Sequence, residues 1–99
     1  MPEFERYSAL IAQHRAELER MGVTSASITG SVARGDSTPE SDLDIVVDYD
    51  TSIVRTTFDL VRVQRVLRKW LGRDVDVISS RALRLSRHSA ILRDARVVF

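Results

Sequence analysis

The stretch GSVARGDSTPESDLDIVV, residues 30–47, decides the fold of this 99-residue chain. It begins with a Gly-Ser pair, runs through ten further residues and then reaches an Asp-Leu-Asp triplet at 42–44. In residues 42–49, apolar side chains alternate with a mostly acidic set, which predicts a strand with one apolar and one acidic face. The turn-forming residues 35–39 predict a loop between a short helical turn and this strand.

The residues before this stretch predict a helix and a strand. Apolar side chains in residues 4–21 recur at steps of three and four and stop at Gly22, which predicts one amphipathic helix. Residues 25–29 predict a strand that leads into Gly30. His14 lies on the apolar side of the predicted helix, so we expect it to be packed and hydrogen-bonded.

The residues after this stretch complete an α/β pattern. Residues 55–71 carry a broad apolar stripe, which predicts a helix, and Thr56 with Asp59 is a typical helix start. Residues 75–78 predict a third strand, and residues 80–93 predict short helical segments. We therefore expect an α/β fold, with a small mixed sheet of three or four strands and flanking helices, as a single domain over residues 1–99.

Composition excludes several classes of protein. Hydrophobic residues make up 43% of the chain and charged residues 29%, which is typical of a folded soluble domain. The absence of cysteine excludes a disulfide scaffold, a thiol nucleophile and a Cys-ligated zinc site. Neither a leader nor an apolar run long enough to span a bilayer is visible, so we expect a cytoplasmic protein without a membrane partner.

Charge is divided unevenly along the chain. Residues 1–50 carry 4 basic and 10 acidic side chains, a net charge of −6, whereas residues 51–99 carry 11 and 4, a net charge of +7. The basic run at 62–73 fits a solvated face or a surface for an acidic partner. Because no aromatic stacking platform accompanies these arginines, we expect no direct binding of nucleic acid.

The Gly-Ser pair has the character of a phosphate site. Gly30, at the end of a predicted strand, lets the backbone approach a phosphate closely. Ser31 opens a helical turn whose free N–H groups attract anions. We therefore expect this site to bind a ligand that carries phosphate.

The acidic residues have the character of a metal site. Alternation places Asp42 and Asp44 on one face of their strand, roughly 7 Å apart. Asp76, on a neighbouring strand, is expected beside them. Three converging carboxylates repel one another, and Mg²⁺ ions with oxygen ligands relieve that repulsion. Two such ions would clamp an in-line phosphoryl displacement, which indicates nucleotidyl transfer.

On these residues the chain resembles the minimal nucleotidyltransferases (MNT) of the DNA polymerase β superfamily. The family's hallmark is a Gly-Ser pair, ten residues, Asp-x-Asp and a later Asp, which here are Gly30, Ser31, Asp42, Asp44 and Asp76. The likeness extends to the segments ARGD at 33–36 and LGRDVDVIS at 71–79. It covers roughly residues 20–99.

The resemblance implies a nucleotidyltransferase fold and a Mg²⁺-dependent transfer of AMP from ATP. Asp42 and Asp44 would bind two Mg²⁺ ions, while Asp76 would bind one ion and help to deprotonate the acceptor hydroxyl. Gly30 and Ser31 would hold the β and γ phosphates. Arg34 is a secondary candidate for contact with a phosphate or the acceptor.

The resemblance also implies a partner. Stand-alone members of this size are similar to the antitoxins of HEPN/MNT toxin–antitoxin pairs, which add AMP to a tyrosine of the HEPN ribonuclease toxin. We therefore expect a HEPN-family toxin as partner in a hetero-oligomer. Two alternatives stay open: a non-catalytic antitoxin that neutralises the toxin by binding, and an adenylyltransferase that acts on a small molecule or a nucleic-acid end.

Four other residues are assigned structural roles by their positions. Trp70 is expected in the core rather than as an anchor for a partner. Asp74 is expected as an exposed strand start rather than as an additional ligand. Asp36 and Ser41 are expected as loop and strand-start residues.

Overall fold

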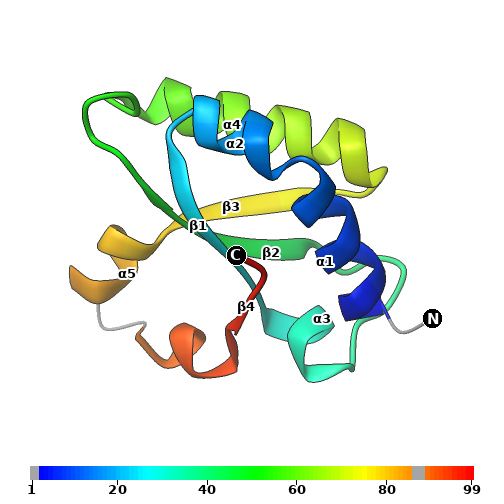
Figure 1. The fold of residues 1–99 in the computed structure, drawn as a ribbon. Helices are drawn as coiled ribbons and strands as arrows, with labels where there is room; N and C mark the ends of the chain where they lie inside the picture. Colours follow the sequence, from blue (N-terminus) through cyan, green and yellow to red (C-terminus); the bar gives the residue numbers. More distant parts are fainter. Residues whose placement is uncertain (1–2, 86–88) are drawn as a thin grey trace.

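The computed structural model describes residues 3–85 and 89–99 (Figure 1). Helices and strands alternate along most of the chain, as the sequence predicts. Their bounds are α1 (Glu3–Gln13), α2 (Arg15–Arg20), β1 (Val23–Thr29), α3 (Gly30–Arg34), β2 (Leu43–Tyr49), α4 (Thr57–Leu71), β3 (Val75–Ser79), α5 (Ser80–Leu85), the 3₁₀ helix η1 (Ser89–Asp94) and β4 (Arg96–Val97).

The four strands form one mixed sheet in the order β3-β2-β1-β4. β1 pairs antiparallel with both β2 and β4, whereas β2 pairs parallel with β3. Parallel neighbours require a crossover connection, and α4 supplies it between β2 and β3. The predicted α/β fold with a small mixed sheet is confirmed.

One face of the sheet is apolar and carries the core. Helices α1, α2 and α4 lie over this face, on the upper side of the sheet in Figure 1. The register of the strands brings aliphatic side chains from β1, β2 and β3 together there. They are Ala26, Ile28, Leu43, Ile45, Val47, Val75 and Val77.

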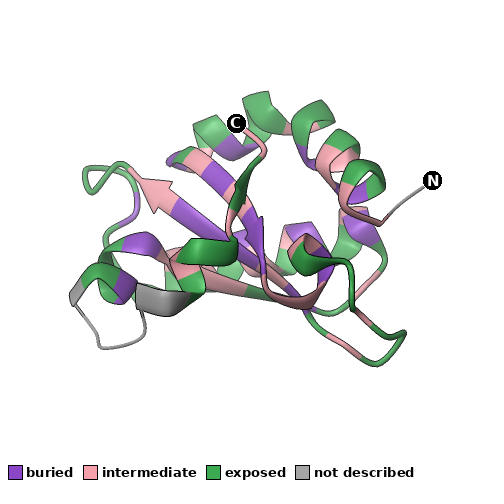
Figure 2. Cartoon of the chain, turned by 90° about the horizontal axis from the view of Figure 1, so that it is seen from below, coloured by how far each residue is buried: buried purple, intermediate pink, exposed green. Residues whose placement is uncertain are grey.

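The opposite face of the sheet is mostly polar. Alternation along the three longer strands places hydroxyl, carboxyl and a few aliphatic groups on this face. Figure 2 views the molecule from this side, where α3, α5 and η1 lie in front of the strands. The side chains that share this face are Ser25, Ser27, Thr29, Asp44, Val46, Asp48, Asp76 and Ile78.

The single helix predicted over residues 4–21 is wrong, because the chain breaks at His14 into α1 and α2. The Nδ1–H of His14 donates to the carbonyl oxygen of Leu10 at 2.9 Å. That oxygen would otherwise accept from the backbone N–H of His14, which donates instead to Ile11 at 3.0 Å. The side chain thus competes with the helical hydrogen bond.

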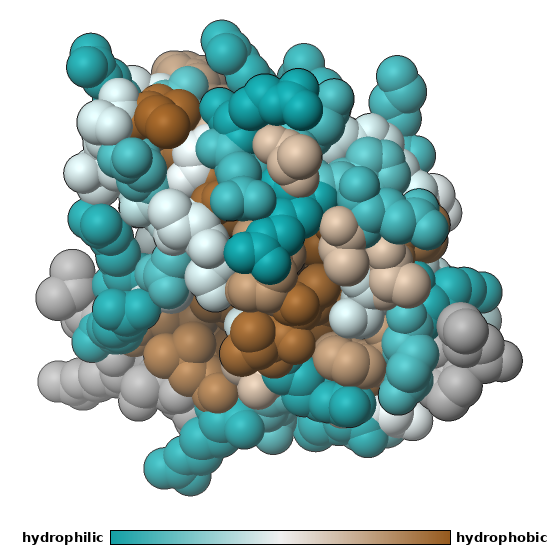
Figure 3. Space-filling model, viewed as in Figure 1, coloured by the Kyte–Doolittle hydropathy of each residue, from teal (hydrophilic) through white to brown (hydrophobic). Residues whose placement is uncertain are grey.

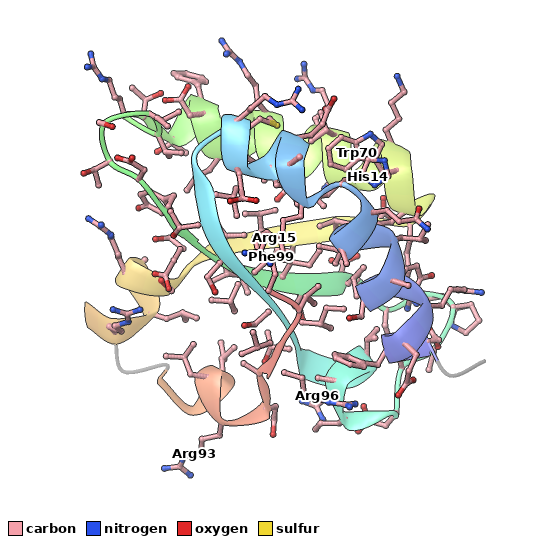
Figure 4. The ribbon with its side chains drawn as sticks, in the orientation of Figure 1. His14, Arg15, Trp70, Arg93, Arg96 and Phe99 are labelled. Atoms are coloured by element: carbon pink, nitrogen blue, oxygen red, sulfur yellow. The ribbon has the colours of Figure 1, made fainter. Side chains whose placement is uncertain are left out.

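The predicted packing of His14 and Trp70 is confirmed. Their rings stack with centroids 4.0 Å apart, and Trp70 packs against the core (Figure 4). The predicted start of α4 is also confirmed, since the Asp59 carboxylate accepts from the backbone N–H of Thr56 at 3.1 Å. Strand bounds differ slightly from expectation: β1 begins at Val23, and β2 begins after Asp42.

Arg73 departs from the solvated face expected for the basic run at 62–73. Its guanidinium donates to the carbonyl oxygens of Thr38 at 2.8 Å and Ser41 at 2.8 Å, and it pairs with the Glu3 carboxylate. Ser37 also donates to Glu3, at 2.6 Å. Arg73 and Glu3 therefore fix the loop that leads from α3 into β2.

Apolar side chains also reach the surface near the end of the chain. Figure 3 shows them gathered below the middle of one face, where Figure 1 draws β4, and Val97 of that strand is 71% exposed. Within the described part of the chain, no helix has both the length and the apolar character needed to cross a membrane.

The contacts of Glu3 predict an acid-sensitive component of stability. The hydrogen bonds donated by Ser37 and Arg73 lower the pKa of Glu3 below its ordinary value. The folded chain therefore binds this proton less readily than the unfolded chain. The stabilisation is complete above the unfolded-state pKa and is lost as the pH falls through the lowered pKa of the folded state.

We expect Glu3→Gln to lower the melting temperature at pH 7 and to have a smaller effect near pH 3. Thermal unfolding followed by circular dichroism at both values measures the difference. Glu5→Gln is the matched control, because Glu5 is an exposed glutamate of the same helix. An effect of Glu3→Gln that is independent of pH would contradict the assignment.

Candidate functional site

A cleft of about 700 Å³ opens on the polar face of the sheet, where β1 ends and α3 begins. This volume lies within the range of small-molecule sites. All the residues predicted for phosphate and metal binding line it. The lining residues are Thr29, Gly30, Ser31, Arg34, Ser41, Asp42, Asp44, Asp76, Ile78, Ile91 and Asp94.

The sheet brings the three predicted carboxylates to this cleft. Asp44 of β2 pairs directly with Asp76 of the parallel strand β3, so their side chains leave the same face. Asp42 lies just before β2 and lines the same cleft. Asp74, by contrast, is an exposed residue immediately before β3 and does not line the cleft.

The Asp44 carboxylate lies against the α-carbon of Gly30. A Cβ added at Gly30 would come within 2.5 Å of the Asp44 Oδ2 atom. Gly30 also has a φ of +73°, in the left-handed region that side chains disfavour. Glycine at this position is therefore required by the backbone conformation and by the close approach of Asp44.

The Asp44 carboxylate lies close to two other negatively charged groups. Burial, together with the charges of Asp76 and Asp42, raises the pKa of Asp44 above its ordinary value. The Arg34 guanidinium acts in the opposite direction and is the smallest of the four influences. The site therefore has an excess of negative charge that a cation would relieve.

The donor set fits a hard divalent cation. Asp42, Asp44 and Asp76 offer only carboxylate oxygens, the ligand type that Mg²⁺ prefers. Within residues 3–85 and 89–99, no three acidic or histidine side chains are drawn tightly enough together to enclose an ion. The three carboxylates thus line one cleft without forming a closed set of metal ligands.

Arg34 lies at the cleft but is already paired. Its side chain lies 3.3 Å from Asp36 and 3.2 Å from Asp94, and it is about half exposed. Contact between Arg34 and a phosphate would therefore require an exchange of partners.

Sequence patterns did not identify five residues of the cleft as part of a site: Thr29, Ser41, Ile78, Ile91 and Asp94. The sequence predicts Asp36 as a loop residue and Ser41 as a strand start; β2 begins two residues after Ser41, and of the two only Ser41 lines the cleft. Ile78 follows Asp76 by two positions, so strand alternation could have placed it there. Ile91 and Asp94 have no such signal, because they lie in η1, well after β3, and belong to no recognisable motif.

Comparison with known proteins identifies the family. A family model described as a nucleotidyltransferase domain matches residues 11–98. The chain is 28% identical to the protein adenylyltransferase MntA of Thermococcus cleftensis over 95% of this chain and 94% of that protein. It is 36% identical to a Methanocaldococcus jannaschii protein, provisionally named a protein adenylyltransferase, over 79% of this chain and 82% of the other.

A solved structure gives the same result. It is described provisionally as a minimal nucleotidyltransferase, and it matches with a TM-score of 0.68 and 34% identity over 93% of this chain and 88% of the other. The sequence, the sheet and the relatives agree: this chain belongs to the nucleotidyltransferase domain family, as one of its minimal members.

Proposed function

We propose that this chain transfers AMP from ATP, with Mg²⁺, to a tyrosine hydroxyl of a partner protein. The partner proposed is a cytoplasmic HEPN ribonuclease toxin, for which this chain would act as the antitoxin. The observation that carries the proposal is the cleft in which Asp42, Asp44 and Asp76 meet beside Gly30 and Ser31. The names of the curated relatives support a protein as the acceptor.

The open cleft favours an acceptor supplied by another macromolecule. Asp42 and Asp76 are exposed, and the helices on the polar face leave these carboxylates accessible. The resemblance to HEPN/MNT antitoxins supplies the class of partner.

Each residue of the site has a role in the proposed reaction. Gly30 and Ser31 would hold the β and γ phosphates, because both residues line the cleft that contains the three carboxylates and Ser31 lies in the first turn of α3. The acceptor oxygen forms a bond to the α phosphorus as the bond to the β-phosphate oxygen breaks, and pyrophosphate leaves. The Asp76 carboxylate would take the proton of the acceptor hydroxyl.

Asp42 and Asp44 would hold two Mg²⁺ ions, with Asp76 as a ligand of one. When bound, these ions neutralise charge on the attacking and leaving oxygens. The chain itself contributes the alignment of Asp44 and Asp76 on one sheet face, which the pairing of β2 with β3 fixes, and Asp42 lines the same cleft just before β2.

Replacing the carboxylates tests the proposal directly. We expect the double variant Asp42→Asn, Asp44→Asn to fold, to bind the partner and to lose transfer by about 100-fold or more. The measurement is mass spectrometry of the co-expressed HEPN protein after incubation with this chain, Mg²⁺ and ATP. The expected product is a partner tyrosine that carries AMP.

Three results separate the candidate functions. An adduct formed by the unmodified chain and absent with the double variant supports protein adenylylation. A tight complex without an adduct contradicts it and supports the non-catalytic antitoxin. If neither a complex nor an adduct forms, the result supports a small-molecule or nucleic-acid acceptor.

The contact between Gly30 and Asp44 generates a second test. We expect Gly30→Ala to cost about 1–3 kcal/mol of stability through backbone strain and, in addition, to displace the Asp44 carboxylate and abolish transfer. Gly72→Ala is the matched control, since Gly72 has a φ of +63° with no atom within 4 Å of an added Cβ.

The two glycine variants are compared by thermal unfolding and by the same transfer assay. Similar losses of stability with transfer lost only in Gly30→Ala would support the role of the contact. Transfer retained in a folded Gly30→Ala variant would show that Asp44 does not need its observed position.

A further inference from the structure

We propose that η1 forms the nucleoside side of the cleft, with Ile91 as the side chain that contacts the nucleoside of ATP and Thr29 as its positioning residue. This inference rests on the proposed function, because it assumes that the cleft binds ATP. It assigns a role to two residues that the motif of the family does not include.

Thr29 is a buried polar residue with one specific partner. Only 1% of its surface is exposed, and its hydroxyl donates to the carbonyl oxygen of Ile91 at 2.7 Å. A buried hydroxyl without a partner is costly, so this hydrogen bond favours one position of η1. Thr29 pairs with Asp44 across the sheet and immediately precedes Gly30, so it links η1 to the centre of the site.

A second contact holds the other end of the same segment. Asp94, the last residue of η1, pairs with Arg34, the last residue of α3, at 3.2 Å. The segment from Ile91 to Asp94 is thus attached at one end to the last residue of β1 and at the other to α3, which carries the Gly-Ser pair. Arg93, between these contacts, points away from the sheet in Figure 4.

Ile91 is an aliphatic side chain that the fold leaves exposed. It lines the cleft and is 37% exposed, although most large aliphatic side chains in the described part of the sheet and its helices are buried. A nucleoside presents an apolar ring face that gains free energy from such a contact. Ile91 also lies on the β1 side of the cleft, together with Gly30 and Ser31, which would hold the phosphates of the same ligand.

The other apolar residue of the cleft lies elsewhere. Ile78 belongs to β3 and follows Asp76 on the same sheet face. It is therefore separated from β1 by the whole width of β2. The contact with a nucleoside is assigned to Ile91 on this ground.

Binding measurements test the assignment without the transfer reaction. The probes are α,β-methylene ATP, which cannot release pyrophosphate, and inorganic tripolyphosphate, each titrated with Mg²⁺ by calorimetry. We expect Ile91→Ala to raise the Kd of the ATP analogue about 10-fold and to leave that of tripolyphosphate within about twofold. Ile53→Ala is the matched control, because Ile53 is 46% exposed and does not line the cleft.

Thr29 is tested by two variants that differ in the hydroxyl. We expect Thr29→Val, which keeps the shape of the side chain, to weaken binding of the ATP analogue as Ile91→Ala does. Thr29→Ser keeps the hydroxyl and should bind within about twofold of the unmodified chain. If Thr29 had only a structural role, Thr29→Val would weaken the binding of tripolyphosphate as well.

The outcomes separate this inference from the proposed function. Equal effects of Ile91→Ala on both probes, or no effect on either, overturn the inference alone. Failure of the unmodified chain to bind the ATP analogue overturns both. The assignment is supported if Ile91→Ala and Thr29→Val weaken binding of the ATP analogue but not of tripolyphosphate, and Thr29→Ser binds both probes.

Discussion

The parallel pairing of β2 with β3 is the constraint on which the rest of the structure depends. It places Asp44 beside Asp76, and the charge of Asp76 is one of the influences that raise the pKa of Asp44. Their repulsion opposes the pairing, and the aliphatic side chains on the opposite face of the same strands stabilise it. Ile45 and Val77, which pair one position further along, are part of the packed core. The core thus holds together groups that would separate if left to their own interactions.

The requirement for glycine at position 30 follows from the same constraint. Because the Asp44 carboxylate lies against the chain at the end of β1, the backbone must turn there without a side chain. The left-handed conformation of Gly30 directs the chain into α3, so Ser31 and Arg34 reach the cleft. A single backbone conformation therefore joins the acidic strand to the segment proposed to bind phosphates.

Much of the fold could be predicted from the sequence because its signals are local. Alternation in residues 42–49 and the stripe of α4 depend on neighbouring residues and on period alone. The junction of three carboxylates could also be predicted, since it needs only two strands and their alternation. The break at His14 could not, because it depends on a side-chain hydrogen bond that competes within a pattern otherwise typical of a continuous helix.

The contacts that complete the cleft were beyond prediction for another reason. Arg73 reaches back to Ser41 and Glu3, and Thr29 reaches forward to Ile91, across long stretches of chain. A hydrogen bond between such distant residues leaves no periodic trace in the sequence. In the sequence, nothing distinguishes Arg73 from the other residues of the basic run, or Thr29 from other β-branched residues of a strand.

These distant contacts differ physically from the core, and the difference bears on function. The core is held by many aliphatic contacts, so the loss of one leaves the carboxylates in place. The segment at Ile91 is fixed to β1 and α3 by two polar contacts, each of which depends on a particular pair of atoms. In the proposed enzyme the acidic residues therefore belong to the rigid part of the fold, while the nucleoside wall depends on a few directional bonds. Affinity for the nucleotide can then change by substitution at Ile91, which belongs to neither strand that carries the carboxylates.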